Sequence, residues 1–331
     1  MNILYTFNDK FVPQAAAGIC SICENNKGAD SIHFYLFTHQ LSDQNKQKLT
    51  EFVHSYRREV TFVELLDLSS YFDFEFDTLG WNPVILARLL MDKLLPLEVE
   101  RIIYLDGDTI VRGSLEELWA TDMGQCAVGG CAEPTVDKAR KAQLGMSEYP
   151  YINSGVLLVD LKIWRENDLG KRIIDFYQAG GGRLFAPDQD AINGALKGEI
   201  FLLHPKYNFS NTFFFYPYRT LKKLMDVRDY ITETACREAK ENPVIVHYLG
   251  EERPWRNKNT HKYRGDFLHY LHKTPWRDMP MEDGWELYFL CWRIFNGVMK
   301  VTPMLRYKII NSLIPAFMAH RSKQLKKNHE K

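Results

Sequence analysis

The strongest constraint on the fold is an alternation of strand-like and helix-like segments along the first 105 residues. Short apolar runs at residues 3–7, 32–38, 60–65 and 101–105 have the pattern of strands. Between them, residues 12–24, 42–56 and 84–95 carry apolar side chains at helical spacing, and Ser42 is a suitable N-cap. Strands that alternate with helices form a mostly parallel sheet with helices on both faces. The sequence therefore predicts an α/β fold.

The later part of the chain continues this pattern. Further strands are expected at residues 126–131, 155–161 and 244–246, and a helix is expected to begin at Pro187. Residues 209–218, FSNTFFFYPY, are rich in aromatic side chains that could form core or a platform for a sugar. We expect one large domain over residues 1–265 and a helical C-terminal extension over residues 266–331.

Two carboxylates stand one residue apart directly after the strand expected at residues 101–105. In an extended chain, side chains at i and i+2 leave the same face, so Asp106 and Asp108 can converge on one point. Ligands of parallel sheets bind at the carboxyl ends of the strands. Two like charges held together favour a cation between them. A structural pair of aspartates in a turn is the alternative, because this short motif is common.

Three later segments place polar side chains beside expected strands or helices. YINSGVLLVDL begins at Tyr151 and carries Asn153, PDQDAIN begins at Pro187, and HYLGEERPW begins at His247. Each has an ordinary structural explanation when taken alone: a turn before a strand, an N-terminal helix cap, and a core histidine.

Taken in this order, the four segments resemble the retaining glycosyltransferases of family 8, which have a GT-A fold, over about residues 1–265. The resemblance implies transfer of a hexose, galactose or glucose, from a UDP-sugar to a glycan or lipid-linked acceptor. It also implies that Asp106, Asp108 and His247 bind Mn²⁺, with Mg²⁺ as the alternative, and that the metal holds the diphosphate. Carboxylate and imidazole ligands completed by phosphate oxygens suit Mn²⁺ better than Ca²⁺.

The resemblance assigns roles to further residues. An acid is more usual in the family where Asn8 stands, and a lysine where Arg253 stands, so the uracil and phosphate contacts of this chain differ from the usual pattern. Gln189 lies near the anomeric carbon in this scheme, and its amide is a poor nucleophile, which favours attack on the face from which UDP departs. The implied catalytic residues are Asp188 and Gln189, the implied nucleotide and donor ligands are Asn8, Asp9, Arg88, Asp106, Gly107, Asp108, Asn153, Gly250 and Arg253, and Glu133 is implied to face the acceptor.

The distribution of charged residues along the chain indicates which kinds of partner to expect. The chain has 42 basic and 42 acidic residues, which gives no reason to expect nucleic acid as a partner. From Leu287 onward, however, nine Lys or Arg stand against one acid, among several aromatic residues. Such a tail suits the surface of an anionic membrane, or it is a helical cap with a solvated basic end. No signal peptide or spanning helix is evident, so we expect a cytoplasmic protein, peripheral on the membrane if the tail binds lipid.

Two other functions and one cysteine motif need to be weighed. DGDTI also resembles the D-x-D-x-T motif of haloacid-dehalogenase-type phosphatases, although that family carries it on its first strand. A degenerate transferase that binds a nucleotide sugar without turnover is the other alternative. Cys20 and Cys23 form a lone C-x-x-C within a helical apolar pattern, and we expect buried thiols there and not a metal or redox site.

Overall fold

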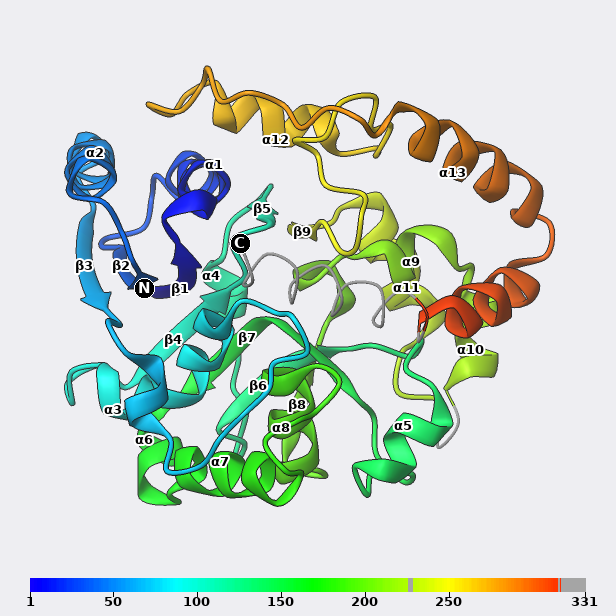
Figure 1. Ribbon diagram of the computed structural model, residues 1–331, viewed down its shortest axis with the longest axis horizontal. Helices are drawn as coiled ribbons and strands as arrows, with labels where there is room; N and C mark the ends of the chain where they lie inside the picture. Colours follow the sequence, from blue (N-terminus) through cyan, green and yellow to red (C-terminus); the bar gives the residue numbers. More distant parts are fainter. Residues whose placement is uncertain (226–228, 315, 317–331) are drawn as a thin grey trace.

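A computed structural model describes residues 1–225, 229–314 and 316 of the chain. Within these residues a seven-stranded sheet has the order β3-β2-β1-β4-β7-β6-β8, and β5 and β9 form a separate two-stranded sheet (Figure 1). The strands are β1 (Asn2–Asn8), β2 (His33–His39), β3 (Glu59–Glu64), β4 (Arg101–Leu105), β5 (Thr109–Val111), β6 (Val128–Ala132), β7 (Ile152–Asp160), β8 (Ile200–Leu203) and β9 (Ile245–His247).

The large sheet is mixed but mostly parallel. Strands β1 to β4 run parallel to one another, β6 is parallel to β8, and β7 runs antiparallel to both of its neighbours, β4 and β6. Alternate residues of β1 face opposite sides: Ile3 and Tyr5 join one core cluster, and Leu4 joins the other. The predicted α/β architecture is confirmed.

Helices cover both faces of the sheet. The α-helices are α1 (Val12–Asn25), α2 (Asp43–Ser55), α3 (Met91–Leu94), α4 (Glu116–Trp119), α5 (Lys138–Gln143), α6 (Leu161–Glu166), α7 (Leu169–Ala179), α8 (Pro187–Ala195), α9 (Asn211–Phe215), α10 (Tyr218–Leu224), α11 (Glu233–Glu241), α12 (Arg264–Leu271) and α13 (Glu286–Met299). The 3₁₀ helices are η1 (Asp9–Phe11), η2 (Leu68–Tyr71), η3 (Pro83–Leu90) and η4 (Pro205–Tyr207). Helices α1 and α2 lie on one face, and η3, α6, α7 and α8 lie on the other (Figure 1).

Most of the expected elements are present, and one differs in type. Strand β4 has the predicted bounds, and the Ser42 side chain caps α2 by accepting a hydrogen bond from the Asn45 backbone. The helix expected at residues 84–95 is instead the 3₁₀ helix η3 followed by the short helix α3. Apolar residues surround this segment on nearly every side, and periods of 3.0 and 3.6 are hard to separate over so few residues.

The prediction of buried thiols is confirmed, and the open question about the aromatic stretch is answered for three of its residues. Cys20 and Cys23 are buried in α1, and all six cysteines are free thiols. In the aromatic stretch, Phe209, Phe213 and Tyr216 belong to a third core cluster, which also holds residues of α12. These three side chains are therefore core.

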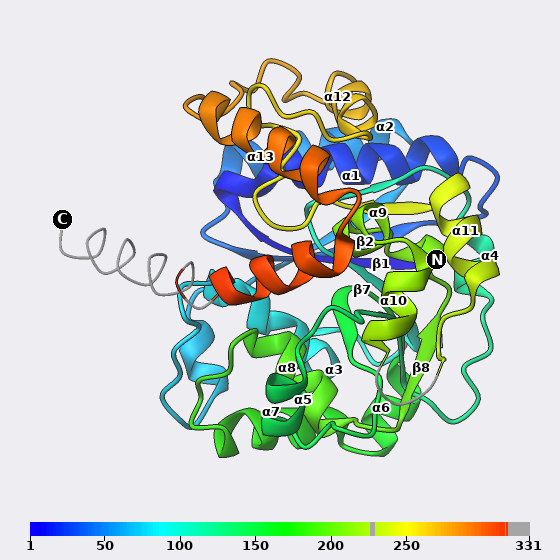
Figure 2. The same cartoon turned by 90° about the vertical axis from the view of Figure 1, so that its right-hand side faces the viewer.

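The C-terminal region is helical, as predicted, and its described part packs on the rest of the chain. Helix α12 lies beside α1, and α13 leads to a helix over residues 303–314 that lies near α10 (Figures 1 and 2). Arg306 is buried there, its guanidinium 4.0 Å from the ring centre of Phe215, and it donates a hydrogen bond to the Tyr216 hydroxyl at 2.9 Å. Phe317 and the basic residues Arg321, Lys323, Lys326, Lys327 and Lys331 lie outside the described residues. The division at residue 265 stays a prediction.

The described helices were compared with the length and hydropathy needed to cross a bilayer. Among residues 1–225, 229–314 and 316, none is both long and apolar enough to do so.

Candidate active site

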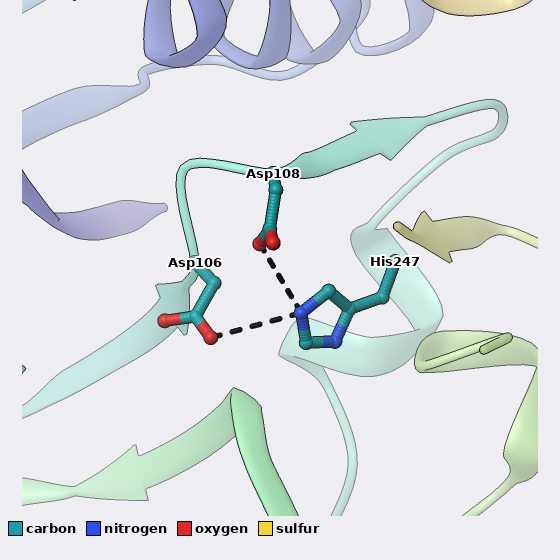
Figure 3. Close-up of side chains that lie close together, drawn as sticks. All are labelled: Asp106, Asp108 and His247. Carbon is teal, nitrogen blue, oxygen red and sulfur yellow. Dashed lines mark ion pairs between the residues drawn. The ribbon is translucent and has the colours of Figure 1, made fainter. Parts of the chain in front are cut away.

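Three potential metal ligands from two distant parts of the chain meet at the carboxyl end of β4. Asp106 follows β4 directly, and Asp108 precedes β5. Strand β5 pairs antiparallel with β9, and this register places His247 opposite Thr109. Because Thr109 follows Asp108 directly, the pairing brings His247 close to Asp108. The ligand atoms of Asp106, Asp108 and His247 all lie within 4.8 Å of one another, and one ring nitrogen of His247 faces both carboxylates (Figure 3).

The imidazole of His247 is neutral and largely shielded from water. Its side chain is 1% exposed, and Nε2 lies 3.2 Å from Asp108 Oδ1 and 3.7 Å from Asp106 Oδ2. Burial lowers the pKa of His247 to about 4, although the Asp106 charge acts in the opposite direction. A neutral imidazole is the form that binds a metal.

Glycine at position 155 makes this approach sterically possible. The Gly155 carbonyl accepts a hydrogen bond from the Asp106 backbone N–H at 2.8 Å. A Cβ atom at Gly155 would lie 2.1 Å from His247 Cε1 and 2.8 Å from Asp106 Oδ2. Any larger residue would therefore displace the imidazole or the carboxylate.

Arg88 lies beneath the cluster and joins two carboxylates. The buried guanidinium lies 2.8 Å from Asp106 Oδ1 and 3.1 Å from Asp188 Oδ2, and it stacks over the Tyr104 ring. Burial raises the pKa of Asp106, but the charge of Arg88 and hydrogen bonds outweigh it and hold that pKa below its ordinary value. For Asp188, burial is the larger influence and its pKa is raised despite Arg88. The positive charge of Arg88 thus offsets the cost of burying a negative charge more fully at Asp106 than at Asp188.

Gln189 is held by hydrogen bonds at both ends of its amide, and Asn153 by two hydrogen bonds to its carbonyl oxygen. Gln189 Oε1 accepts from the Ser154 backbone N–H at 3.0 Å, and Nε2 donates to the Tyr151 hydroxyl at 3.0 Å. Asn153 Oδ1 accepts from the backbone N–H of Gly155 at 2.9 Å and from Asn208 Nδ2 at 2.9 Å. Ser154 also donates its hydroxyl to Asp188, so β7 connects these side chains to the Arg88 network.

Arg253 reaches the cluster from the loop after β9. Its guanidinium forms an ion pair with Asp108 Oδ2, and its Nε donates to the Gly250 carbonyl at 2.8 Å. Gly250 adopts a φ of 70°, a left-handed conformation that glycine takes without strain. Gly107 packs against the Phe11 ring, where a Cβ atom would lie 2.9 Å from Cδ1. Glycine therefore suits position 250 because of its backbone conformation, and position 107 because the Phe11 ring approaches closely.

The remaining predicted residues lie at the ends of other elements. Asn8 ends β1. Asp9 Oδ1 accepts hydrogen bonds from the backbone and hydroxyl of Ser42, both at 2.8 Å, and from Asn45, so its carboxylate binds the start of α2. These bonds outweigh the effect of burial and hold the pKa of Asp9 below its ordinary value. Glu133 is buried after β6, and its Oε1 accepts from the Thr212 hydroxyl at 2.6 Å.

Sequence reasoning missed the residues that support this cluster. Tyr104 donates a hydrogen bond to Asp106 at 2.7 Å, and Ser154 joins Asp188 to β7. Asn208 Nδ2 donates to Asn153 Oδ1, and Asn208 Oδ1 lies 2.9 Å from His247 Nδ1. Tyr104 lies in the strand expected at residues 101–105, and Ser154 lies in the segment YINSGVLLVDL. Asn208, by contrast, follows the 3₁₀ helix η4 in a segment with no local pattern that signals a site.

The arrangement has the composition of a divalent-cation site. Two carboxylate ligands and one neutral imidazole nitrogen converge, and that nitrogen, His247 Nε2, is buried with no hydrogen-bond partner among the described residues. Around it, the guanidinium groups of Arg88 and Arg253 face three carboxyl groups, those of Asp106, Asp108 and Asp188. A bound cation would add positive charge to a group of two guanidinium and three carboxyl groups, and it would give Nε2 a partner.

Comparisons with known proteins agree with the fold. General stress protein A of Bacillus subtilis is 25% identical over 279 residues, which cover 83% of this chain and 94% of that protein. Lipopolysaccharide 1,2-glucosyltransferase of Escherichia coli K12 is 25% identical over 283 residues, covering 84% and 79%. The crystal structure of galactosyltransferase LgtC in complex with donor and acceptor sugar analogs matches with a TM-score of 0.71 at 22% identity, covering 83% and 96%.

The match to a family extends over most of the chain. The model of glycosyl transferase family 8 matches residues 2–259, which include every residue of the cluster. The phosphatase alternative is wrong, because this match includes the DGDTI motif itself. The GT-A fold and the matched residues together lead to one conclusion: the chain belongs to glycosyl transferase family 8.

Proposed function

We propose that the chain is a metal-dependent retaining hexosyltransferase that moves galactose or glucose from a UDP-sugar to a glycan or lipid-linked acceptor. The observation that carries this proposal is the convergence of the partly exposed Asp106 with the buried Asp108 and His247 at the end of β4. We propose Mn²⁺ as the metal, with Mg²⁺ as the alternative, because imidazole is a better ligand for Mn²⁺ than for Mg²⁺. A divalent cation held there would supply Lewis-acid stabilisation of the negative charge that grows on the diphosphate.

The residues around the cluster then have roles in binding the donor. Arg88 and Arg253 bring positive charge to the diphosphate, with Arg253 leaving Asp108 when phosphate oxygens arrive. Gly107 and Gly250 allow the nucleotide to approach the backbone. Asn8 and Asp9 bind the uracil, Asn153, Asp188 and Gln189 hold the donor sugar, and Glu133 faces the acceptor.

The hydrogen bonding of the nearby acids supports transfer without a covalent intermediate. Asp188 pairs with Arg88 and Ser154, and Asp190 Oδ1 accepts from Arg140 and Tyr151 while Oδ2 accepts from the Ala186 backbone. Carboxylates engaged in this way are poor nucleophiles. We therefore propose attack on the face from which UDP departs, with a β-phosphate oxygen taking the proton of the acceptor hydroxyl. Capture of a sugar covalently bound to Asp188 or Asp190 would contradict this mechanism.

The identity of the donor sugar is tested by measuring the release of UDP from different UDP-sugars. Purified protein is incubated with a panel of UDP-sugars, with Mn²⁺, with Mg²⁺ and with EDTA. We expect release from UDP-galactose or UDP-glucose with Mn²⁺, and background release with EDTA. If UDP-sugars bind with Mn²⁺ but no donor and no glycan acceptor gives turnover, the chain is a nucleotide-sugar binding protein. If nothing binds, the site assignment is wrong.

We also propose that the C-terminal helices contact an anionic membrane surface. Among the described residues, seven of the eleven large exposed hydrophobic side chains lie on α13 and the segment that follows it. Four of them, Leu287, Leu290, Ile294 and Val298, lie on α13 at helical spacing and form one apolar stripe beside the exposed cations Arg293 and Lys300. Val301, Leu305 and Leu313 lie on the segment after α13, which also carries the exposed Lys308.

The charge of the region favours lipid as the partner of this stripe. Eight of the nine cations counted from Leu287 onward add positive charge that attracts anionic headgroups, and the ninth, Arg306, is buried. A lipid-linked acceptor of the lipopolysaccharide type would then share a surface with the enzyme, and the relative from Escherichia coli is a lipopolysaccharide glucosyltransferase. We place the protein at the cytoplasmic face, where its six free thiols suit a reducing compartment.

Glutamate substitutions within the stripe are expected to weaken vesicle binding. Ile294 and Val298 are each 59% exposed, so the double change Ile294→Glu and Val298→Glu leaves the fold intact. Removing two apolar contacts and adding two negative charges is expected to reduce binding at least about tenfold. Cosedimentation with vesicles containing phosphatidylglycerol measures this, and neutral vesicles test the role of charge.

Matched substitutions elsewhere separate this surface from a general effect of charge. Leu66 and Leu97 are 83% and 79% exposed and lie outside the stripe. The double change Leu66→Glu and Leu97→Glu adds the same charge, and it is expected to leave vesicle binding nearly unchanged. Equal loss in both double variants, or no binding by the wild-type chain, would refute the membrane contact.

A further inference from the structure

Asn208 connects the metal-binding histidine to the backbone of β7. It is 1% exposed and follows η4, and its neighbour Phe209 pairs with β9 through the hydrogen bond from His247 N to Phe209 O at 3.0 Å. Its side-chain amide lies between two others: Nδ2 is 2.9 Å from Asn153 Oδ1, and Oδ1 is 2.9 Å from His247 Nδ1. The three side chains form a chain of hydrogen bonds that begins at the backbone N–H of Gly155.

The direction of this chain follows from its first donor. A backbone N–H can only donate, so the Asn153 atom that faces Gly155 N must be the carbonyl oxygen. That oxygen also contacts Asn208, which must therefore present its NH₂ group. The other end of the Asn208 amide is then an acceptor, and it faces His247 Nδ1. Because Asn208 Oδ1 can only accept, His247 Nδ1 must carry the proton of this hydrogen bond.

A proton on Nδ1 leaves the lone pair of the neutral ring on Nε2. This atom is buried, has no hydrogen-bond partner among the described residues, and lies between the oxygens of Asp106 and Asp108. A lone pair facing two carboxylates is repelled unless a positive charge lies between them. The alternative ring orientation would turn Cδ2 toward Asn208 and lose the hydrogen bond.

We propose that Asn208 is the positioning residue that holds His247 as the Nδ1–H tautomer and directs its Nε2 lone pair at the cation. The proposal rests on the metal-dependent function proposed above. A hydrogen bond to the outer nitrogen of a ligating histidine fixes the ring and raises its basicity, and its loss typically weakens metal binding about 10–100-fold.

Three variants separate the parts of this chain. Asn208→Leu removes both hydrogen bonds at nearly the same volume. Asn208→Asp keeps an acceptor for His247 Nδ1 but loses the donor to Asn153. Asn26→Leu is the control: Asn26 is a buried amide that bonds the backbone of Leu115 and Ile22 at the far end of α1, so its removal costs stability without touching the site.

The first readout is the protonation of the histidine ring in metal-free protein. Long-range proton–nitrogen NMR of ¹⁵N-histidine-labelled protein distinguishes a protonated from an unprotonated ring nitrogen, and His247→Gln assigns the signal. In the wild type, and in the Asn208→Asp and Asn26→Leu variants, we expect a proton on Nδ1, the nitrogen that faces residue 208. In the Asn208→Leu variant we expect a mixture of tautomers.

The second readout is Mn²⁺ affinity, measured by calorimetry in the presence of UDP. We expect affinity about 10–100-fold weaker for Asn208→Leu, and within a few-fold of the wild type for Asn208→Asp and Asn26→Leu. A wild-type Nδ1 that carries no proton, or an Asn208→Leu variant that binds Mn²⁺ as tightly as the wild type, would overturn the role of Asn208. A wild-type protein that binds no Mn²⁺ would overturn the metal-dependent function itself, and with it the cation that this lone pair is proposed to face.

Discussion

Replacing Asp108 by asparagine is expected to lower metal-dependent UDP release by about 10²–10⁴-fold. The change removes one negative charge from the proposed ligand set, and Lewis-acid stabilisation of a leaving group is worth several kcal/mol, with each 1.36 kcal/mol a factor of ten in rate. Asp108 Oδ1 lies 3.2 Å from His247 Nε2. The amide NH₂ of an asparagine at this position could donate to that nitrogen, which would occupy the lone pair as well.

The measurement is the rate of UDP release with the donor identified in the panel, at a series of Mn²⁺ concentrations. Because the variant lacks a ligand, EDTA is expected to slow the wild type strongly and the variant very little. Asp266→Asn is the matched control, since Asp266 forms a partly exposed ion pair with Arg112 far from the cluster, and we expect an unchanged rate. If Asp108→Asn retains more than about a tenth of the wild-type rate, Asp108 is not a ligand that the reaction depends on.

The sheet and the carboxylate pair could be predicted because local patterns determine them. Apolar runs of strand length alternate with helical segments over the first 105 residues, and β4 has the bounds that its apolar run indicated. The positions of Asp106 and Asp108 follow from β4 alone, because the end of a buried strand fixes where the next side chains go.

The contacts that hold His247, Asn208 and Arg88 around the carboxylate pair could not be predicted, because they depend on pairings between distant segments. His247 reaches the carboxylates through the antiparallel pairing of β5 with β9, which lies outside the main sheet. Asn208 is placed by the bridge between Phe209 and Val246, and no motif surrounds it. Arg88 was expected on a regular helix, but the 3₁₀ helix η3 carries it, and only the packing shows that it pairs with both Asp106 and Asp188.

Replacing Arg88 by methionine is expected to lower the free energy of unfolding by about 3–5 kcal/mol at pH 7. Arg88 is 3% exposed, and its loss leaves the carboxylates of Asp106 and Asp188 without their shared cation. Removing one partner of a buried ion pair costs this much because the remaining charge stays buried without compensation. Methionine preserves most of the buried volume, so the charge and the hydrogen bonds are the main change.

The effect is expected to depend on pH in a defined direction. In the wild type the pKa of Asp106 is lowered, so this group contributes stability above the unfolded-state pKa of about 3.9, and that contribution is lost as the pH falls. Without Arg88, the folded-state pKa of Asp106 rises, and that of Asp188, which is already raised, rises further. Groups with raised pKa destabilise the fold as the pH increases. The difference in stability between wild type and variant should therefore be smallest near pH 4 and grow toward pH 7.

Denaturant unfolding of both proteins at several pH values measures this difference. Arg172→Met is the matched control: Arg172 lies 2.6 Å from Glu199, but the two side chains are 40% and 57% exposed. An exposed ion pair contributes roughly 0–1 kcal/mol, and we expect a small loss with little pH dependence between pH 5 and 7. Two outcomes would contradict this role: Arg88→Met is no more destabilising than Arg172→Met, or its effect shrinks as the pH rises from 4 to 7. In either case Arg88 does not compensate the charges of Asp106 and Asp188, and these two acids must be neutral in the folded protein.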